Sequence, residues 1–176
     1  AFSASGVMYA FNSRQGLDDM LLELPLLREC AVRSEVLSAA ELAQREPALK
    51  PGMAGGVFLP DDAHFRPDAY CAELARAVRG LGGVIDEHCE VLALQCLAGK
   101  IQAVQTNKGD YVAEDVVMAM AVWSSALAKS IELNLPIQPG KGYSITYNKP
   151  DIMPRTPLVL SERSVCVTAW PDGYRL

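Results

Sequence analysis

The sequence predicts an α+β fold with a mixed, largely antiparallel sheet and flanking helices. Residues 67–82 place apolar side chains at spacings of three and four, which is typical of a helix that covers a core. Short apolar runs separated by turn residues, as at 97–100 and 107–110, indicate antiparallel neighbouring strands. The unbroken apolar run at 115–122 is typical of an interior strand covered on both faces, although a buried helix has the same pattern.

The N-terminal half is predicted to alternate strands with helices. Pro25 lies inside the first helix and is expected to kink or divide it. Ser38 and Glu41 form a capping box for a short helix that ends before Pro47. The other expected elements are a strand at 6–11, the first helix at 14–30, a strand at 55–59 and the helix at 67–82.

The C-terminal half is predicted to be mostly strand. Pro171-Asp172-Gly173 predicts a tight hairpin whose return strand is cut off at Leu176, so we expect the chain to be a piece of a longer protein. The expected elements are a meander of strands at 84–97, 100–106 and 111–112, the interior strand at 115–122, a helix at 124–131, and strands at 137–147, 158–160 and 165–170.

Composition and charge exclude several functional classes. Sixteen basic and 21 acidic residues give a net charge of −5. The sequence has no stripe of basic residues interleaved with aromatic ones, the pattern that is typical of nucleic-acid binding. No apolar run approaches 18 residues, so no membrane-spanning helix is expected. The five cysteines form no C-x-x-C pair and the two histidines, His64 and His88, are far apart, so no metal site is predicted.

A complete catalytic constellation is missing from the sequence. No G-x-S-x-G elbow occurs, and Gly140-Lys141-Gly142 lacks the spacing of a phosphate loop. Gly80-Leu81-Gly82-Gly83 follows a helix instead of opening one, so it is no dinucleotide fingerprint. Asp61-Asp62 lies in a turn, where solvated carboxylates are the simpler interpretation. Taken alone, the chain is predicted to be most of a substrate or binding domain.

Three motifs in a fixed order resemble the D-amino-acid oxidase-like family of FAD-dependent oxidoreductases. They are Glu46-Pro47-Ala48-Leu49, then Gly55-Gly56-Val57-Phe58-Leu59-Pro60-Asp61, then Lys141-Gly142-Tyr143-Ser144. Between the last two motifs stand the helix at 67–82, the meander and the apolar run, in the order that the family has. The resemblance spans essentially all 176 residues.

The resemblance implies that the chain is the middle of an enzyme. Residues 1–82 would be the first part of a substrate domain, with its helix at 67–82. Residues 83–131 would hold the meander and two strands of an incomplete FAD-binding domain. Residues 132–176 would return to the substrate-domain sheet. The family's glycine-rich N-terminal unit and its C-terminal flavin-closing segment are not in this sequence.

The resemblance also implies a set of FAD contacts. Val91 matches the position whose main chain meets the adenine of FAD. Met120, Ala121 and Trp123 match a segment of the pattern small-Gly-x-aromatic that passes close to the flavin, with Trp123 behind the flavin site. This sequence has Ala121 where the family has glycine, and a Cβ is strained wherever the backbone needs a positive φ.

Candidate substrate contacts are less specific. Tyr143 and Lys141 lie after the glycines of the third motif, where a tyrosine could line the pocket or bind a carboxylate; a sheet-surface tyrosine and a solvated lysine are the alternative. Arg66 and Arg175 carry the fork that pairs with a carboxylate, and Arg66 also fits a surface position. No catalytic residue is assigned, because hydride transfer to a flavin needs no Ser/His/Asp triad.

The activity implied is that of a D-amino-acid dehydrogenase, in which oxidative deamination yields a 2-oxo acid and ammonia. The implied cofactor is FAD, and the implied electron acceptor is a membrane quinone or the respiratory chain. The implied location is the cytoplasm, on the inner membrane without spanning it. Two alternatives stay open: an oxidase of glycine or sarcosine from the same family, and a non-catalytic binding module, which Ala121 favours.

Overall fold

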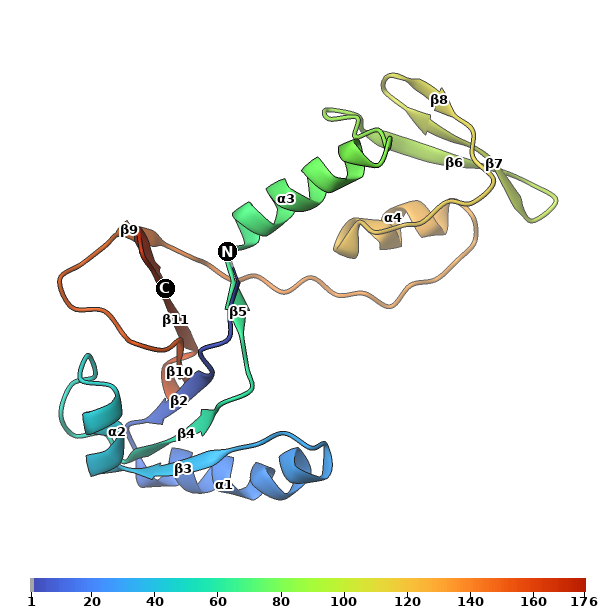
Figure 1. Ribbon diagram of the computed structural model, residues 1–176. Coiled ribbons are helices and arrows are strands. Elements are labelled where there is room, and N and C mark those ends of the chain that lie inside the picture. The colour runs from blue at the N-terminus through green and yellow to red at the C-terminus, as the bar shows by residue number, and fades with distance from the viewer. Residues whose placement is uncertain (1) are drawn as a thin grey trace. The chain divides into compact units, whose positions relative to one another are not determined.

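The computed structural model describes residues 2–176, which divide into two compact units (Figure 1). The first unit combines the residues up to Leu74 with Tyr143–Leu176, and the second is Ala75–Gly142. Helix α3 (Pro67–Gly80) begins in the first unit and ends in the second. Among the described residues, no helix combines the length and apolar character needed to cross a bilayer.

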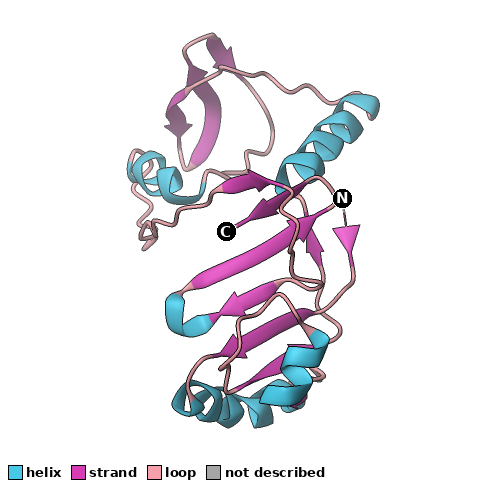
Figure 2. Ribbon diagram, turned by 90° about the vertical axis from the view of Figure 1, so that its left-hand side faces the viewer, coloured by secondary structure: helices cyan, strands magenta, loops and turns pink. Residues whose placement is uncertain are grey.

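A seven-stranded sheet forms the first unit, and its strands are drawn in magenta in Figure 2. The strand order is β3-β4-β2-β10-β11-β12-β9, and every neighbouring pair is antiparallel except β2 with β10. This confirms the mixed, largely antiparallel sheet that the sequence predicts. The strands are β2 (Val7–Phe11), β3 (Glu35–Ser38), β4 (Gly55–Leu59), β9 (Thr146–Asn148), β10 (Leu158–Leu160), β11 (Val165–Trp170) and β12 (Gly173–Arg175). A separate two-stranded sheet pairs β1 (Phe2–Ser3) with β5 (His64–Phe65).

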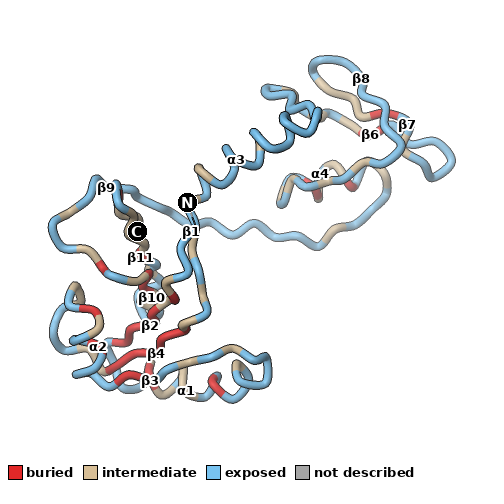
Figure 3. Tube along the Cα trace, in the orientation of Figure 1, coloured by how far each residue is buried: buried red, intermediate tan, exposed pale blue. Residues whose placement is uncertain are grey.

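The core of the first unit lies on both faces of this sheet, where the buried stretches gather in Figure 3. Successive side chains of a strand point to opposite faces. Met8 and Ala10 of β2 therefore join one cluster, with Leu42 of α2 (Ala39–Arg45), while Phe11 joins the other, with Leu17 of α1 (Arg14–Glu29). The central strands are buried on both sides for this reason.

Helices α1 and α2 begin as predicted, but α1 is not divided. The Ser38 hydroxyl accepts a hydrogen bond from the Glu41 N–H (3.3 Å) and the Glu41 carboxylate accepts one from the Ser38 N–H (2.8 Å), which confirms the capping box. Helix α1 runs through Pro25 as one element. Leu17 and Leu24 bury against the sheet, and this packing offsets the backbone hydrogen bond that proline cannot make.

Glu162 joins the short helix η2 (Ser161–Arg163) to the start of α1. Its carboxylate accepts hydrogen bonds from the Ser13 hydroxyl, from the Asn12 N–H (2.6 Å) and from the Ser13 N–H (2.9 Å). These bonds lower the pKa of Glu162 from its ordinary value of 4.5 to about 2, the Ser13 hydroxyl contributing most. A carboxylate at a helix N-terminus also interacts favourably with the helix dipole.

We expect a pH-dependent stability from this carboxylate. The folded pKa is below the unfolded pKa, so the stabilisation is complete above pH 4.5 and is lost as the pH falls toward 2. The Glu162→Gln variant should therefore melt at a lower temperature than the natural protein at pH 7, and the difference should shrink at pH 3. Thermal unfolding at both pH values measures this, with Glu114→Gln as a control on an exposed loop. A difference that is independent of pH would contradict the assignment.

The second unit is built on a three-stranded meander, as predicted. Strands β6 (Val91–Leu97), β7 (Lys100–Thr106) and β8 (Gly109–Tyr111) pair in sequence order. The predicted strand at 84–97 is too long, because residues 84–90 form a loop in which His88 has a φ of 54°. Side chains from the turn of the β7–β8 hairpin form hydrogen bonds with backbone groups of this loop. The loop is therefore held by a turn and does not pair with a strand.

The predicted interior strand at 115–122 is wrong. Residues 115–120 have no regular structure, and η1 (Ala121–Trp123) and α4 (Ser124–Lys129) follow. Val117 is 87% exposed, while Met118 and Met120 are half-buried. A strand needs a neighbour for its backbone groups, and within residues 2–176 none pairs with this segment. The predicted strand at 137–147 is likewise reduced to β9.

Helix α3 confirms the predicted helix, but its apolar stripe is not buried. Tyr70 and Leu74 are 47% exposed, and Val78 is 41% exposed. The stripe has the spacing of a core-facing helix, so its pattern correctly predicts the helix and does not determine what packs against it.

Candidate functional site

A hollow of about 260 Å³ in the second unit collects three of the four residues that the sequence predicts as FAD contacts. Val91 lines it from the start of β6, Met120 from the segment before η1, and Trp123 from the end of η1. The walls are mainly apolar, as is usual for sites that take a planar organic ring. The full lining is Val91, Leu92, Met120, Trp123, Ala126, Leu127 and Ser130.

Strand β6 is an edge of the meander, because the sheet order is β6-β7-β8. Its inner edge pairs with β7, with Val91 opposite Thr106. The other edge has no strand partner within the described part of the chain, so main-chain N–H and C=O groups of β6 are open to another binding partner. A main-chain contact of the kind predicted at Val91 needs such an edge.

Ala121, the fourth predicted residue, lies between two residues of the hollow and has a φ of 48°. This is the left-handed region, where a side chain with a Cβ costs about 1–2 kcal/mol relative to the right-handed region. From the sequence, strain was expected at this position if its φ is positive, and the φ is positive. The turn that leads into α4 thus has a backbone conformation that favours glycine, although the residue at this position is alanine.

The predicted substrate residues Lys141 and Tyr143 do not line this hollow. Both are exposed, in a segment of irregular backbone at 137–145, and Lys141 is assigned to the second unit while Tyr143 is assigned to the first. Their role in substrate binding stays a prediction.

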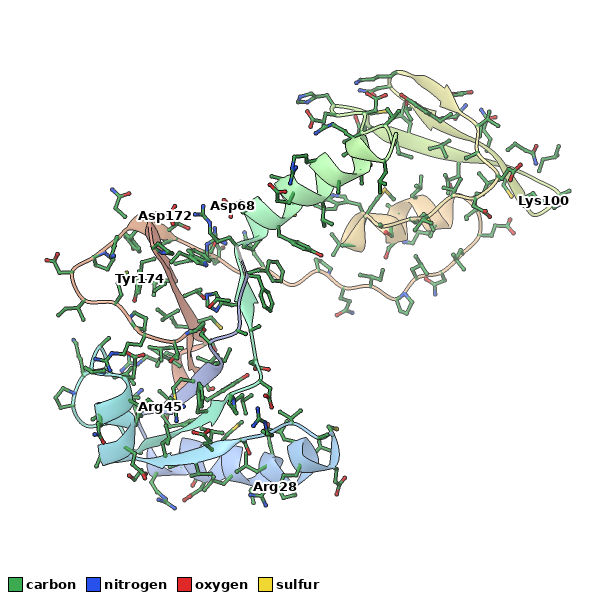
Figure 4. All side chains as sticks on the ribbon, viewed as in Figure 1. Arg28, Arg45, Asp68, Lys100, Asp172 and Tyr174 are labelled. Carbon is green, nitrogen blue, oxygen red and sulfur yellow. The ribbon has the colours of Figure 1, made fainter. Side chains whose placement is uncertain are left out.

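The candidate arginines of the first unit have defined contacts. Arg66 forms ion pairs with Asp68 (2.8 Å) and Asp172 (2.7 Å), the two carboxylates labelled in Figure 4. These pairs raise the pKa of Arg66, with Asp68 contributing most. Arg175 places its guanidinium 5.2 Å from the centre of the Trp170 ring and donates from Nε to the Thr146 hydroxyl (3.0 Å). Arg66 is therefore engaged by carboxylates of its own chain.

Two of the three family motifs have clear structural roles. Glu46 is 1% exposed, and its carboxylate accepts hydrogen bonds from the Arg155 N–H (2.7 Å) and the Thr156 N–H (3.2 Å). Gly55 has a φ of 151°, and a Cβ there would lie 2.6 Å from the Leu37 carbonyl oxygen of the adjacent strand. These residues hold the sheet of the first unit together.

The helical wall of the hollow was not predicted from the sequence. Trp123, Ala126, Leu127 and Ser130 are spaced i, i+3, i+4 and i+7, so they share one face of a helix. That spacing was visible in the sequence and marks the side of α4 that faces the hollow. The opposite wall depends on where β6 begins, and the apolar pattern did not predict its start.

A family model and curated relatives match nearly the whole chain. The family model described as FAD dependent oxidoreductase (DAO) matches residues 1–176. A D-amino acid dehydrogenase of Vibrio cholerae is 29% identical over 176 residues, which is 97% of this chain and 42% of that protein. The chain thus spans less than half the length of the curated relatives that it matches.

Solved structures share the fold at lower identity. Glycine oxidase from Geobacillus kaustophilus superposes with a TM-score of 0.90 at 21% identity, over 99% of this chain and 47% of that one. L-proline dehydrogenase from P. horikoshii has a TM-score of 0.85 at 18% identity, over 99% and 48% of the two chains. These likenesses extend along nearly the whole of residues 2–176.

Proposed function

The chain belongs to the DAO family of FAD-dependent oxidoreductases, and from that premise we propose that it is part of a D-amino-acid dehydrogenase. The reaction proposed for the whole protein is oxidative deamination: a D-amino acid loses two electrons and two protons to become an imino acid. Water then releases ammonia and leaves a 2-oxo acid. The similarity to the Vibrio cholerae enzyme along 97% of the chain favours this substrate class.

The single observation that carries the proposal is the gathering of Val91, Met120 and Trp123 around one hollow. Val91 lies 29 positions before Met120 in the sequence, and only the fold brings it next to Met120 and Trp123. Bound FAD would supply the acceptor for the hydride that leaves the substrate α-carbon. The hollow is smaller than most sites for a whole drug-sized ligand, so it suits one part of FAD.

The roles proposed for the chain's own residues follow from their chemistry. The open main-chain edge at Val91 offers hydrogen bonds to an adenine ring. Met120 and Trp123 offer apolar surface that excludes water. Ala121 turns the chain sharply, so the main chain before α4 can approach a bound ring closely. We also propose that Lys141 and Tyr143 contact the substrate from the motif that they share with the family.

Spectroscopy and turnover of the whole encoded protein test this function. The protein should bind FAD in a one-to-one ratio, and D-alanine should bleach the flavin absorption band under anaerobic conditions. With a redox dye as acceptor, we expect kcat/KM for D-alanine to exceed that for glycine, sarcosine and L-proline by roughly tenfold or more. Greater activity on glycine or sarcosine would favour the alternative oxidase, and a protein without bound flavin would favour a non-catalytic module.

We further propose that electrons pass to a membrane quinone and that the protein works at the cytoplasmic face of the inner membrane. The similarity to a dehydrogenase supports this acceptor. The same turnover assay distinguishes a quinone acceptor from oxygen. A soluble quinone analogue should sustain turnover, while an oxygen electrode should record little oxygen consumption. Rapid oxygen consumption would identify an oxidase instead.

A further inference from the structure

The loop at residues 84–90 is clamped by the β7–β8 hairpin through side chains of both segments. Lys108 donates from Nζ to the Asp86 carboxylate (2.7 Å) and to the Glu87 carbonyl oxygen (2.6 Å). The Tyr111 hydroxyl donates to the same Asp86 carboxylate. Asp86 is therefore the point at which the loop is held from two positions of the hairpin.

Asn107 adds a second set of bonds closer to β6. Its side-chain oxygen accepts from the Glu90 N–H (2.9 Å), its side-chain nitrogen donates to the His88 carbonyl oxygen (3.3 Å), and its own N–H donates to the Glu90 carbonyl oxygen (3.1 Å). The Cys89 thiol also donates to the Tyr111 hydroxyl, at 3.9 Å. One hairpin thus makes seven hydrogen bonds to five consecutive residues of the loop, 86–90.

The hairpin is itself rigidly closed. The Thr106 hydroxyl donates to the Gly109 carbonyl oxygen (2.6 Å) and accepts from the Lys108 N–H (3.0 Å). Thr106 is also the residue that pairs with Val91 in the ladder. The clamp and the first residue of β6 therefore share one anchor, and the position of Val91 depends on the contacts that precede it.

The clamp is electrostatically complementary. The bonds from Lys108 and Tyr111 hold the pKa of Asp86 below its usual range, with Lys108 contributing most. The same carboxylate raises the pKa of Lys108 and of Tyr111. Asp86 is therefore ionised, and Lys108 and Tyr111 are protonated, throughout the neutral pH range. His88, with its positive φ, lies in the middle of the clamped loop and adds strain that these bonds offset.

We propose that Asp86, Lys108 and Tyr111 are positioning residues for the adenine end of FAD. They fix the loop at 84–90, and through it the main chain of Val91, in the conformation that forms one wall of the hollow. This inference rests on the proposed function, in which Val91 meets the adenine. A loop of seven residues that must be ordered on binding costs conformational entropy, and the clamp removes that cost before FAD arrives.

Titration of the apo form of the whole encoded protein with FAD tests the clamp, with flavin fluorescence as the readout. Asp86→Ala should raise the dissociation constant for FAD about tenfold, and Tyr111→Phe, which removes one hydroxyl, about threefold. Asp86→Asn keeps one acceptor oxygen, for either Lys108 or Tyr111, and should recover part of the affinity. At saturating FAD the turnover number of each variant should equal that of the natural protein.

The matched control is Asp110→Asn, since Asp110 lies in the same hairpin, its side chain accepts from Gln95 (3.2 Å), and within residues 2–176 it forms no hydrogen bond with the loop at 84–90. The proposal is overturned if Asp86→Ala and Tyr111→Phe bind FAD as tightly as this control. If Asp86→Ala does not fold, Tyr111→Phe alone decides. A natural protein that fails to bind FAD would refute the proposed function, whereas tight binding by every variant would refute only the clamp.

Discussion

The Glu46→Ala variant of the whole encoded protein is expected to lose about 3 kcal/mol of unfolding free energy. The substitution removes the buried acceptor for the N–H groups of Arg155 and Thr156, and it leaves a cavity where the side chain was. The bonded segment leads directly into β10, and the Pro157 carbonyl oxygen accepts from the Met8 N–H (2.9 Å). The loss therefore reaches the middle of the seven-stranded sheet.

Denaturant unfolding monitored by circular dichroism measures this effect. Glu46→Gln preserves the shape and one acceptor oxygen, so its loss should be clearly smaller than that of Glu46→Ala. Glu29→Ala, at the exposed C-terminal end of α1, should change the stability by less than about 0.5 kcal/mol. If Glu46→Ala unfolds at the same denaturant concentration as this control, the buried carboxylate does not stabilise the sheet as argued.

The Ala121→Val variant is expected to show the second large effect. It should raise the dissociation constant for FAD about tenfold, which equals a loss of about 1.4 kcal/mol of binding free energy. A β-branched side chain is strained at the φ of 48° that this residue has, more so than alanine. The turn between Met120 and Trp123 would shift to relieve the strain, and both side chains line the hollow. The dissociation constant of apo protein for FAD is the quantity to measure.

Ala121→Gly should act in the opposite direction and tighten FAD binding, because glycine adopts a positive φ without strain. Ala119→Val is the matched control, since Ala119 is exposed and has a φ outside the left-handed region. Equal FAD affinity of Ala121→Val, Ala121→Gly and the control would show that the backbone at Ala121 has no influence on the flavin site. It would also remove the argument that Ala121 favours a non-catalytic module.

Local patterns in the sequence predicted much of the secondary structure. The capping box at Ser38 and Glu41, the turns of the meander and the Pro171-Asp172-Gly173 hairpin all depend on neighbours within a few residues, and each is confirmed. The family motifs were recognised by their residues, but their physical meaning was not. The burial of Glu46 and the close approach of Gly55 to Leu37 involve contacts between separate segments.

The errors concern segments whose structure depends on a partner. Residues 115–120 have the composition of an interior strand, yet a strand is stable only where another strand satisfies its backbone. Residues 84–90 were predicted to extend β6, and instead the Asp86, Asn107 and Lys108 side chains turn them into a clamped loop. Apolar pattern is a property of one segment, whereas pairing is a property of two.

The sequence by itself determined the α+β class, the positions of most helices and turns, and the membership of a flavin-dependent family. These follow from short-range periodicity, turn chemistry and the order of motifs along the chain. Only the tertiary structure decided that Val91, Met120 and Trp123 share one hollow, that Ala121 has a positive φ, and that a hairpin holds the loop before β6. The physical reason is that these features arise from contacts between residues distant in sequence, and such contacts leave no periodic signal in either segment alone.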